Sequence, residues 1–243
     1  MKLKKLIAKL LLLGVGFVPS QLLAQTSLPL AENLINFNSS QGETLLVESK
    51  ARQDYIPLSL QFETQENLAF CGVASIVMVL NALSIPAPKA TEWVMYHRFT
   101  QDNVFDNPKT ESIITKETVS RQGMTLQELA GLLKSYPVEV EVYHGNEVSL
   151  PEFRQRIINN LKQENNFVLV NYLRSTIGQE RGGHISPIAA YNEQSDRFLI
   201  LDVSRYKYPP VWVKAEDLWK ATNTIDSVSK KTRGFVLINT ELD

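Results

Sequence analysis

The sequence offers one strong candidate for nucleophilic chemistry, its single cysteine. Cys71 is the only cysteine among 243 residues, so no disulfide can form within the chain. It lies where the polar segment 61–70 meets a long apolar segment, and Gly72 follows it. A thiol at the start of a helix is activated by the free N–H groups of that helix and by a neighbouring base. This position favours a catalytic thiol, and Gly72 would let a substrate backbone come close to it. The alternative is an inert buried cysteine.

A base and an orienting acid follow later in the chain. Of the three histidines, His184 follows two glycines and opens an apolar segment, whereas His97 and His144 lack such a context. Asp202 lies one predicted hairpin away, with the turn centred near Gln194. If the two side chains meet across that hairpin, the carboxylate would fix the imidazole tautomer and stabilise its cation. A core histidine that is merely satisfied by Asp202 is the alternative.

Acyl transfer also needs donors for the oxyanion, and Gln65 is the candidate. It lies six residues before Cys71 in the polar segment, where an exposed glutamine would be the ordinary interpretation. The order Cys71, His184 and Asp202, with more than a hundred residues between the first two, is similar to that of papain-like cysteine enzymes.

The segments that must position these residues indicate an α+β fold. A short helix is predicted over 44–51, opened by residues 39–43, and a buried helix from Cys71 to before Pro86; apolar residues at helical spacing predict two more, over 124–133 and 150–163. Strands are predicted over 138–143, 167–173, 184–191, 197–203 and 234–238. Residues 61–70 read as a loop, and residues 97–118 as a polar excursion over the surface. Helices that precede antiparallel strands favour one α+β domain over 25–243, with the cysteine on the helical part and His184 and Asp202 on the sheet.

The first 24 residues are typical of a secretory signal peptide. Met1–Lys5 is basic, Leu10–Val18 is apolar, and Ala24 supplies a small residue at the expected cleavage site. The apolar run is too short to span a bilayer. We therefore predict export, to the periplasm, with an amphipathic anchor helix as the alternative.

Composition excludes some classes of function. The net charge is −1, and 21% of the residues are charged with both signs mixed, so no basic field for nucleic acid is expected. One cysteine and three scattered histidines have no metal-ligand spacing, so we predict no metal site and no bound cofactor.

Separate motifs in order resemble the phytochelatin synthase family. They are QENLAFCGVAS (65–75), GHISPI (183–188), LILDV (199–203), KYPP (207–210) and RGF (233–235). The resemblance runs from about residue 35 to the end of the sequence.

The resemblance implies a papain-like fold and a covalent mechanism. Cys71 would attack the Cys–Gly bond of glutathione and release glycine, and the γ-glutamylcysteinyl group would pass to a second glutathione, forming phytochelatin, or to water. The family's catalytic positions fall on Cys71, His184, Asp202 and the oxyanion residue Gln65. Its substrate-binding positions fall on Asp226, Arg233, Gly183 and Asn171.

The sequence also departs from the plant and fungal pattern, because it ends soon after residue 235 and holds no second cysteine. We therefore expect hydrolysis to exceed synthesis, and a heavy metal to arrive only as a glutathione thiolate complex. The oligomeric state is open, with a homodimer as one candidate. A general papain-like peptidase of the periplasm and a periplasmic thiol- or metal-binding protein are the alternative functions, and release of free glycine from glutathione separates them.

Overall fold

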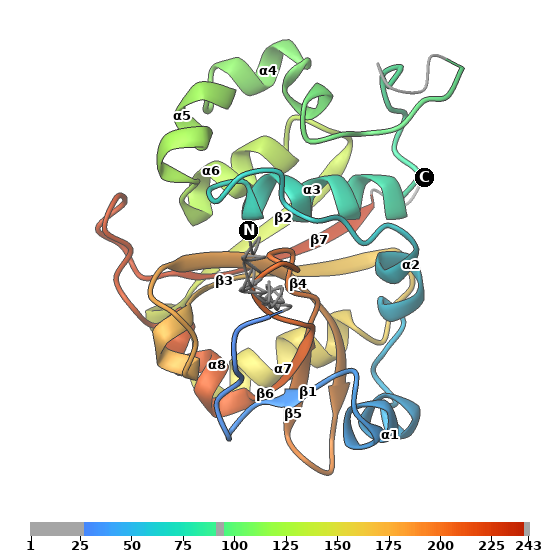
Figure 1. The fold of residues 1–243 in the computed structure, drawn as a ribbon. Helices are drawn as coiled ribbons and strands as arrows, with labels where there is room; N and C mark the ends of the chain where they lie inside the picture. The colour runs from blue at the N-terminus through green and yellow to red at the C-terminus, as the bar shows by residue number, and fades with distance from the viewer. Residues whose placement is uncertain (1–26, 91–94, 241–243) are drawn as a thin grey trace, which may run out of the picture.

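The computed structural model describes residues 27–90 and 95–240 (Figure 1). The predicted signal peptide, residues 1–24, lies outside the described residues. The helices are α1 (Ser40–Glu48), α2 (Tyr55–Leu60), α3 (Cys71–Ala82), η1 (Asn103–Phe105), α4 (Pro108–Glu111), α5 (Lys116–Gln122), α6 (Leu126–Leu133), η2 (Gly145–Glu147), α7 (Leu150–Asn160), η3 (Arg174–Ile177) and α8 (Ala215–Thr222). The strands are β1 (Ile35–Asn36), β2 (Val138–His144), β3 (Asn166–Leu173), β4 (Gly183–Asn192), β5 (Arg197–Ile200), β6 (Val211–Lys214) and β7 (Gly234–Thr240).

The strands form one sheet in the order β1-β6-β5-β4-β3-β7-β2. Every pairing between neighbouring strands is antiparallel. The predicted α+β class is therefore confirmed. None of the helices within residues 27–90 and 95–240 is long and apolar enough to cross a membrane.

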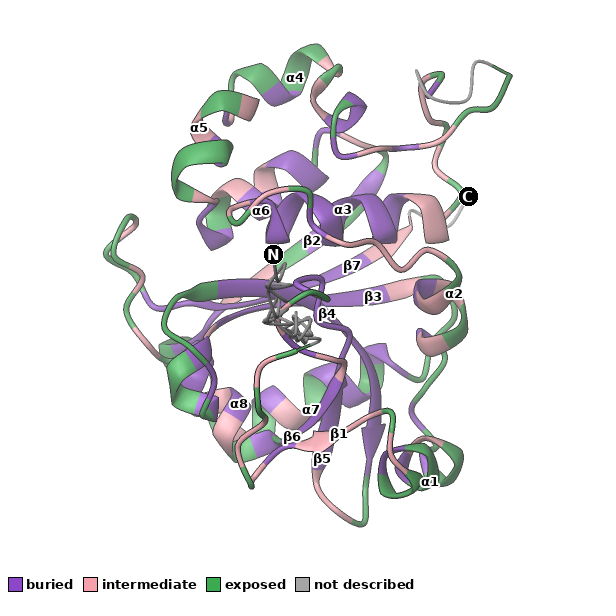
Figure 2. Cartoon of the chain, viewed as in Figure 1, coloured by how far each residue is buried: buried purple, intermediate pink, exposed green. Residues whose placement is uncertain are grey.

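Apolar side chains leave both faces of the sheet, and each face is covered by helices. Along β3, Phe167 and Leu169 pack into the core formed with α3 and α6, whereas Val168 and Val170 pack into the core formed with α7 and α8. This alternation follows from the two-residue period of a strand. Figure 1 shows the two groups of helices on opposite sides of the sheet, and Figure 2 shows that the strands between them are largely buried.

Helix α3 carries the cysteine and is the most buried helix of the fold. Residues 71–80 are all buried, which agrees with a helix that is apolar on every side. Gly72 is needed for this packing, because a Cβ there would lie 2.6 Å from the sulfur of Met124. The sequence prediction that Gly72 makes room for a substrate is therefore wrong, since Met124 fills that space.

Several predicted elements are confirmed, and their boundaries have clear causes. Helix α6 has the predicted capping box, in which Thr125 and Glu128 each accept from the other's backbone N–H. The predicted helix over 44–51 instead begins at Ser40, because Ser39 caps it by accepting from the N–H of Gly42.

Two predictions need larger corrections. The strand predicted over 197–203 ends at Ile200, beside a bulge in β4, and Asp202 lies just beyond it. The segment 97–118 is not a surface excursion, because it forms η1, α4 and the start of α5 and fully buries Phe99 and Val104. Its many polar residues, such as Asn103, cap turns and bind the backbone, so composition alone concealed the fold. Helices α2 and α8 and strand β6 lacked any pattern that we recognised.

Candidate active site

The thiol of Cys71 lies at the first residue of α3. The residue before it, Phe70, provides no side-chain cap, so side chains do not occupy the first N–H groups of the helix. Such N–H groups and the helix dipole favour negative charge at this end. The backbone N–H of Cys71 is among them, and it can donate to an oxygen that develops charge during attack on a carbonyl.

His184 and Asp202 meet as the sequence predicted. Nε2 of His184 lies 2.9 Å from Oδ1 of Asp202, and Oγ of Ser186 lies 2.9 Å from the same nitrogen. On the other side the ring neighbours Cys71, whose pKa it lowers, and both residues line the same cavity. Tyr172 packs edge-on against the ring, with centroids 5.6 Å apart. The imidazole is thus fixed between the acid and the thiol.

The electrostatics favour a thiolate–imidazolium pair. Burial alone would raise the pKa of the Cys71 thiol, but the hydrogen bond and charge of His184 outweigh it, and the pKa is lowered. Burial alone would lower the pKa of His184, but the charge of Asp202 raises it above its ordinary value. Burial opposes the charge of Asp202 too, yet His184 and Arg174 hold the pKa of that carboxyl well below its usual range.

Arg174 is a member of the site that sequence reasoning missed. Its Nη1 and Nη2 donate to the two carboxylate oxygens of Asp202 at 2.7 and 2.9 Å, and its exposed fraction is only 4%. Its backbone N–H also donates to the carbonyl of Gly182 at 3.0 Å, just before β4 begins. Arg174 therefore holds both the acid and the segment that leads to His184. The only local signal was a basic residue directly after a buried strand.

Ser75 joins the nucleophile helix to the histidine strand, and it was also missed. Its Oγ lies 2.7 Å from the carbonyl oxygen of Cys71 and 3.2 Å from that of Ile185, the residue after His184. Ser75 is completely buried. The hydroxyl of Ser75 thus links the backbone at Cys71 to the backbone next to His184, and it helps to hold the thiol and the imidazole in position.

Gln65 connects the nucleophile loop to the segment after Asp202. Its Nε2 donates to the carbonyl of Asn67 at 2.6 Å, its Oε1 accepts from Ser204, and its N–H donates to the carbonyl of Val203 at 3.0 Å. The side chain is buried, not exposed. An amide nitrogen has two hydrogens, so one remains for a ligand after the bond to Asn67. The oxyanion role of Gln65 stays a prediction.

Cys71 and His184 open onto a cavity of about 630 Å³. All four residues that the resemblance assigned to substrate binding line the same cavity: Asn171, Gly183, Asp226 and Arg233. Its wall also includes Ser120, Arg121 and Gln122 at the end of α5, which are exposed. These residues lie just beyond the segment 97–118, and the sequence analysis assigned them no role.

Arg233 is seated on the backbone of Gly183. A Cβ at Gly183 would lie 2.8 Å from Nη2 and 3.2 Å from Nε of Arg233, so a glycine is required for this contact. Nη1 donates to the carbonyl of Ile225 at 2.7 Å, and Nη2 lies 3.3 Å from Oδ2 of Asp226. Nε is buried without a partner among the described residues. The guanidinium is therefore rigidly held and has a donor left.

Asp226 shapes the loop that carries it as well as pairing with Arg233. Its Oδ1 accepts from the N–H groups of Val228 and Ser229 at 2.9 Å each. The side chains of Asp226 and Arg233 are 14% and 7% exposed. The pair is thus largely buried at the cavity wall, not an exposed ion pair.

A metal site has no support in the described part of the chain. Within residues 27–90 and 95–240, no three His, Cys, Asp or Glu side chains gather as a ligand set. The cavity holds Cys71 and His184 together with two arginines, Arg121 and Arg233.

Comparisons with known proteins agree with this chemistry. The family model described as phytochelatin synthase matches residues 25–235. Glutathione gamma-glutamylcysteinyltransferase 3 of Lotus japonicus is 36% identical over 208 residues, which are 84% of this chain and 42% of that protein. Glutathione gamma-glutamylcysteinyltransferase 2 of Arabidopsis thaliana is 34% identical, over 84% of this chain and 44% of that protein.

The similarity extends to fungi. The glutathione gamma-glutamylcysteinyltransferase of Schizosaccharomyces pombe is 30% identical over 212 residues, which are 86% of this chain and 50% of that protein. The chain thus spans two fifths to one half of the length of these relatives. Because the family model covers most of the sequence, the chain belongs to the phytochelatin synthase family.

Proposed function

We propose that the protein cleaves the Cys–Gly bond of glutathione and transfers the γ-glutamylcysteinyl group to an acceptor, in a papain-like arrangement. One observation carries the proposal: a single cavity holds Cys71 and His184 together with the Arg233–Asp226 pair. The relatives named glutathione gamma-glutamylcysteinyltransferase support the same substrate.

The first half-reaction uses the thiolate–imidazolium pair. The thiolate of Cys71 attacks the carbonyl carbon of the Cys–Gly bond, and the oxyanion is stabilised by the N–H of Cys71 and by Gln65. His184 donates its proton to the nitrogen of the departing glycine, and a thioester remains on the enzyme. Asp202 keeps its charge throughout and holds the ring in place.

The second half-reaction reverses the proton transfer. An acceptor, which is water or the amine of a second glutathione, attacks the thioester while His184 takes its proton. The sulfur of Cys71 leaves as the thiolate. The exposed end of α5 forms part of the wall, so we expect water to reach the acyl group. We propose that hydrolysis is the faster branch, because water at about 55 M competes unless an acceptor is held with a high effective molarity. Heavy metal would enter only as a glutathione thiolate complex.

The charges of the cavity match those of glutathione. Its γ-glutamyl unit carries an ammonium and a carboxylate, which fit Asp226 and Arg233 side by side. Asn171 and Gly183 border the same part of the wall. The glycine end carries a second carboxylate, and Arg121 is a second cation on this cavity wall. Three ionic groups of one small peptide therefore have partners of opposite sign.

The test is the release of glycine and γ-glutamylcysteine from glutathione, measured by chromatography. We expect wild-type protein to release glycine, with γ-glutamylcysteine as the main second product and longer chains as minor ones, and Cys71→Ala to release neither while it keeps its circular dichroism spectrum. The isomer in which the glutamyl residue has an α-linkage is the matched substrate control, because it has the same atoms and charges. Equal cleavage of both isomers would favour a general peptidase, and glycine release by Cys71→Ala would remove the proposed nucleophile.

We also propose that the protein is exported after cleavage near Ala24. The basic and apolar order of residues 1–24 supports this proposal. N-terminal sequencing of protein from the periplasm of its native host should find a start near Gln25. Recovery of chains that still begin at Met1 in the cytosol would refute it.

A further inference from the structure

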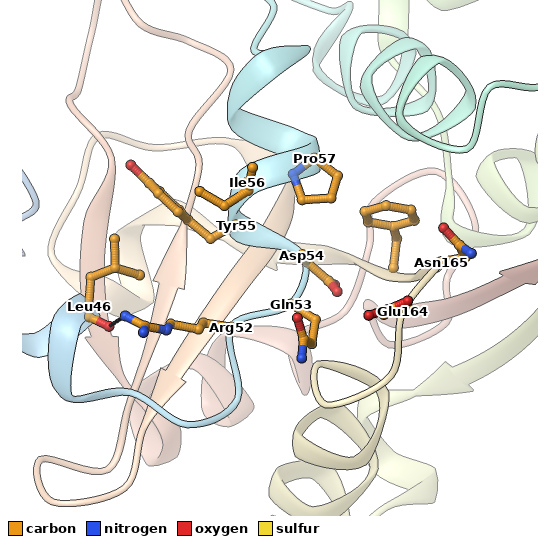
Figure 3. Close-up of a pocket in the computed structure, with 10 residues that line it drawn as sticks. Leu46, Arg52, Gln53, Asp54, Tyr55, Ile56, Pro57, Glu164 and Asn165 are labelled. Carbon is orange, nitrogen blue, oxygen red and sulfur yellow. Dashed lines mark hydrogen bonds between the residues drawn. The ribbon is translucent and has the colours of Figure 1, made fainter.

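A second cavity, of about 620 Å³, lies apart from the active site. It has no lining residue in common with the cavity around Cys71. Its wall comes from α1, from the start of α2 and from the loop before β3 (Figure 3): Leu46, Arg52, Gln53, Asp54, Tyr55, Ile56, Pro57, Glu164, Asn165 and Phe167. Nothing in the acyl-transfer mechanism uses this cavity.

Asp54 is the unusual residue of this wall. Only 2% of its surface is exposed, and its Oδ2 has no hydrogen-bond partner among the described residues. It precedes α2, where an aspartate ordinarily accepts from the first N–H groups of the helix, yet its side chain makes no such bond. Figure 3 shows the carboxyl group pointing from the start of α2 towards Glu164. A buried carboxyl without a partner is unfavourable, so it needs a role that offsets this cost.

The missing partner must be a donor, and the surroundings favour a cation. Besides Asp54, the charged groups that face the cavity are Arg52 and Glu164, and Tyr55 is the only other titratable group of the wall. Figure 3 shows the guanidinium of Arg52 directed towards α1 and away from Asp54, and its Nη1 donates to the carbonyls of Leu46 and Val47 at 2.8 and 3.2 Å. Two carboxyl groups therefore face the cavity, and the one cation of the wall points away from Asp54.

The rest of the wall limits the kind of cation. Ile56, Pro57 and Phe167 give one side an apolar surface. Within the described residues no three His, Cys, Asp or Glu side chains gather as a metal ligand set, and this wall offers only two carboxyl groups. An ammonium group carries three N–H donors on a compact charge and can be attached to an apolar chain. A ligand with an ammonium group and an alkyl chain would therefore match both the carboxyl groups and the apolar side of the wall.

We propose that this cavity binds a small primary alkylammonium ion, with Asp54 accepting from the ammonium and the apolar wall covering the alkyl chain. Glu164, at the exposed side, adds a second carboxylate that a diamine would use. Burial raises the pKa of Asp54 well above its usual range, and a cation bound beside the carboxyl would lower that pKa again.

The test is isothermal titration calorimetry of the full-length protein with n-butylammonium chloride. We expect Asp54→Asn, which keeps the shape and removes the charge, to weaken binding at least tenfold, the order of one charge-assisted hydrogen bond. Glu193→Gln, at an exposed turn and outside the lining of the cavity, is the matched control and should bind as the wild type does. Butane-1,4-diammonium should bind more tightly than n-butylammonium, and Glu164→Gln should abolish that difference.

Two further measurements keep the result unambiguous. Asp54→Asn should unfold at an equal or higher urea concentration than the wild type, because it removes a buried carboxyl without a partner, and it should release glycine from glutathione at the wild-type rate. If this variant fails to fold, the comparison of n-butylammonium with butane-1,4-diammonium on the wild type and on Glu164→Gln still tests the site. Absence of binding to the wild type, a diamine preference that Glu164→Gln leaves unchanged, or undiminished binding by folded Asp54→Asn would each overturn the proposal.

Discussion

Replacing Arg174 with methionine should destabilise the protein strongly, because the substitution leaves Asp202 charged in the core. Arg174 donates two hydrogen bonds to Asp202, at 2.7 and 2.9 Å, and the side chains are 5% and 0% exposed. Removing one partner of a buried ion pair typically costs about 3–5 kcal/mol. Since His184 and the N–H of Ser204 still donate to Asp202, the cost should fall near the lower end, about 3 kcal/mol.

The protein offers a matched control for this substitution. Arg154 also binds an aspartate through two donors, reaching Asp196 at 2.7 and 2.8 Å, but those side chains are 27% and 42% exposed. Arg154→Met should therefore cost only about 0–1 kcal/mol, as for other solvent-exposed pairs. Both variants remove an arginine that binds an aspartate through two donors, and the two sites differ mainly in burial. The difference in their losses of unfolding free energy therefore measures the effect of burial.

The assay is urea unfolding at pH 7, followed by circular dichroism, with thermal unfolding as a second measurement. In a domain of this size about 1 kcal/mol corresponds to roughly 2–4 °C, so Arg174→Met should lower Tm by about 6–12 °C. Glycine release should also fall, since the acid that orients His184 is no longer fixed. Loss of no more than about 1 kcal/mol, equal to that of Arg154→Met, would refute the reasoning.

The pH dependence supplies an independent check on the same pair. Because the folded-state pKa of Asp202 is depressed, its contribution to stability is present above the unfolded value of about 3.9 and is lost as the pH falls towards the folded value. The difference in unfolding free energy between wild type and Arg174→Met should therefore shrink below about pH 4. A constant difference from pH 7 to pH 3 would mean that Asp202 is not the partner affected.

Four further predictions concern catalysis. Asp202→Asn should move the midpoint of the pH–rate profile for glycine release to higher pH, because the thiolate of Cys71 loses support when the imidazolium is less stable; an unmoved midpoint would exclude this coupling. Gly183→Ala should raise KM for glutathione, because the new Cβ would lie 2.8 Å from Nη2 of Arg233; an unchanged KM would mean that the guanidinium moves without loss. Arg233→Lys should lower glutathione cleavage, because lysine keeps the charge but lacks the planar guanidinium. Iodoacetamide should still alkylate Cys71 at the wild-type rate, because the Cys71–His184 pair is unchanged. Unchanged cleavage would leave Arg233 a purely structural role. Gln65→Ala should lower kcat by roughly 10²–10³ with little change in KM if the amide stabilises the oxyanion, and an unchanged kcat would limit Gln65 to its contacts with Asn67 and Ser204.

Local signals in the sequence predicted much of the scaffold. The apolar segment after Cys71 predicted a buried helix, and the Thr125–Glu128 pattern predicted the start of α6, because both depend on residues a few positions apart. The strict alternation at 138–143 predicted β2 for the same reason. The hairpin between β4 and β5 followed from turn residues between two apolar runs, and it brought His184 and Asp202 together as expected.

Other elements were hidden because their signals are not local. Helix α8 and strand β6 are short, so each contains too few apolar residues to show a period. Their apolar side chains are buried only because other parts of the fold pack against them. The segment 97–118 looked like a surface loop because its polar side chains serve as caps and turn bonds, while Phe99 and Val104 supply the buried contacts.

The sequence by itself determined which residues could react, namely one thiol, one well-placed histidine and one acid. Only the tertiary structure decided what surrounds them, because those contacts join residues far apart in the chain. The hydroxyl of Ser75 reaches Ile185 across 110 positions, and Arg174 reaches Asp202 across 28. How much such a pair contributes to stability depends on its burial. Burial is set by how α3 packs on the sheet, and no spacing in the sequence reveals it.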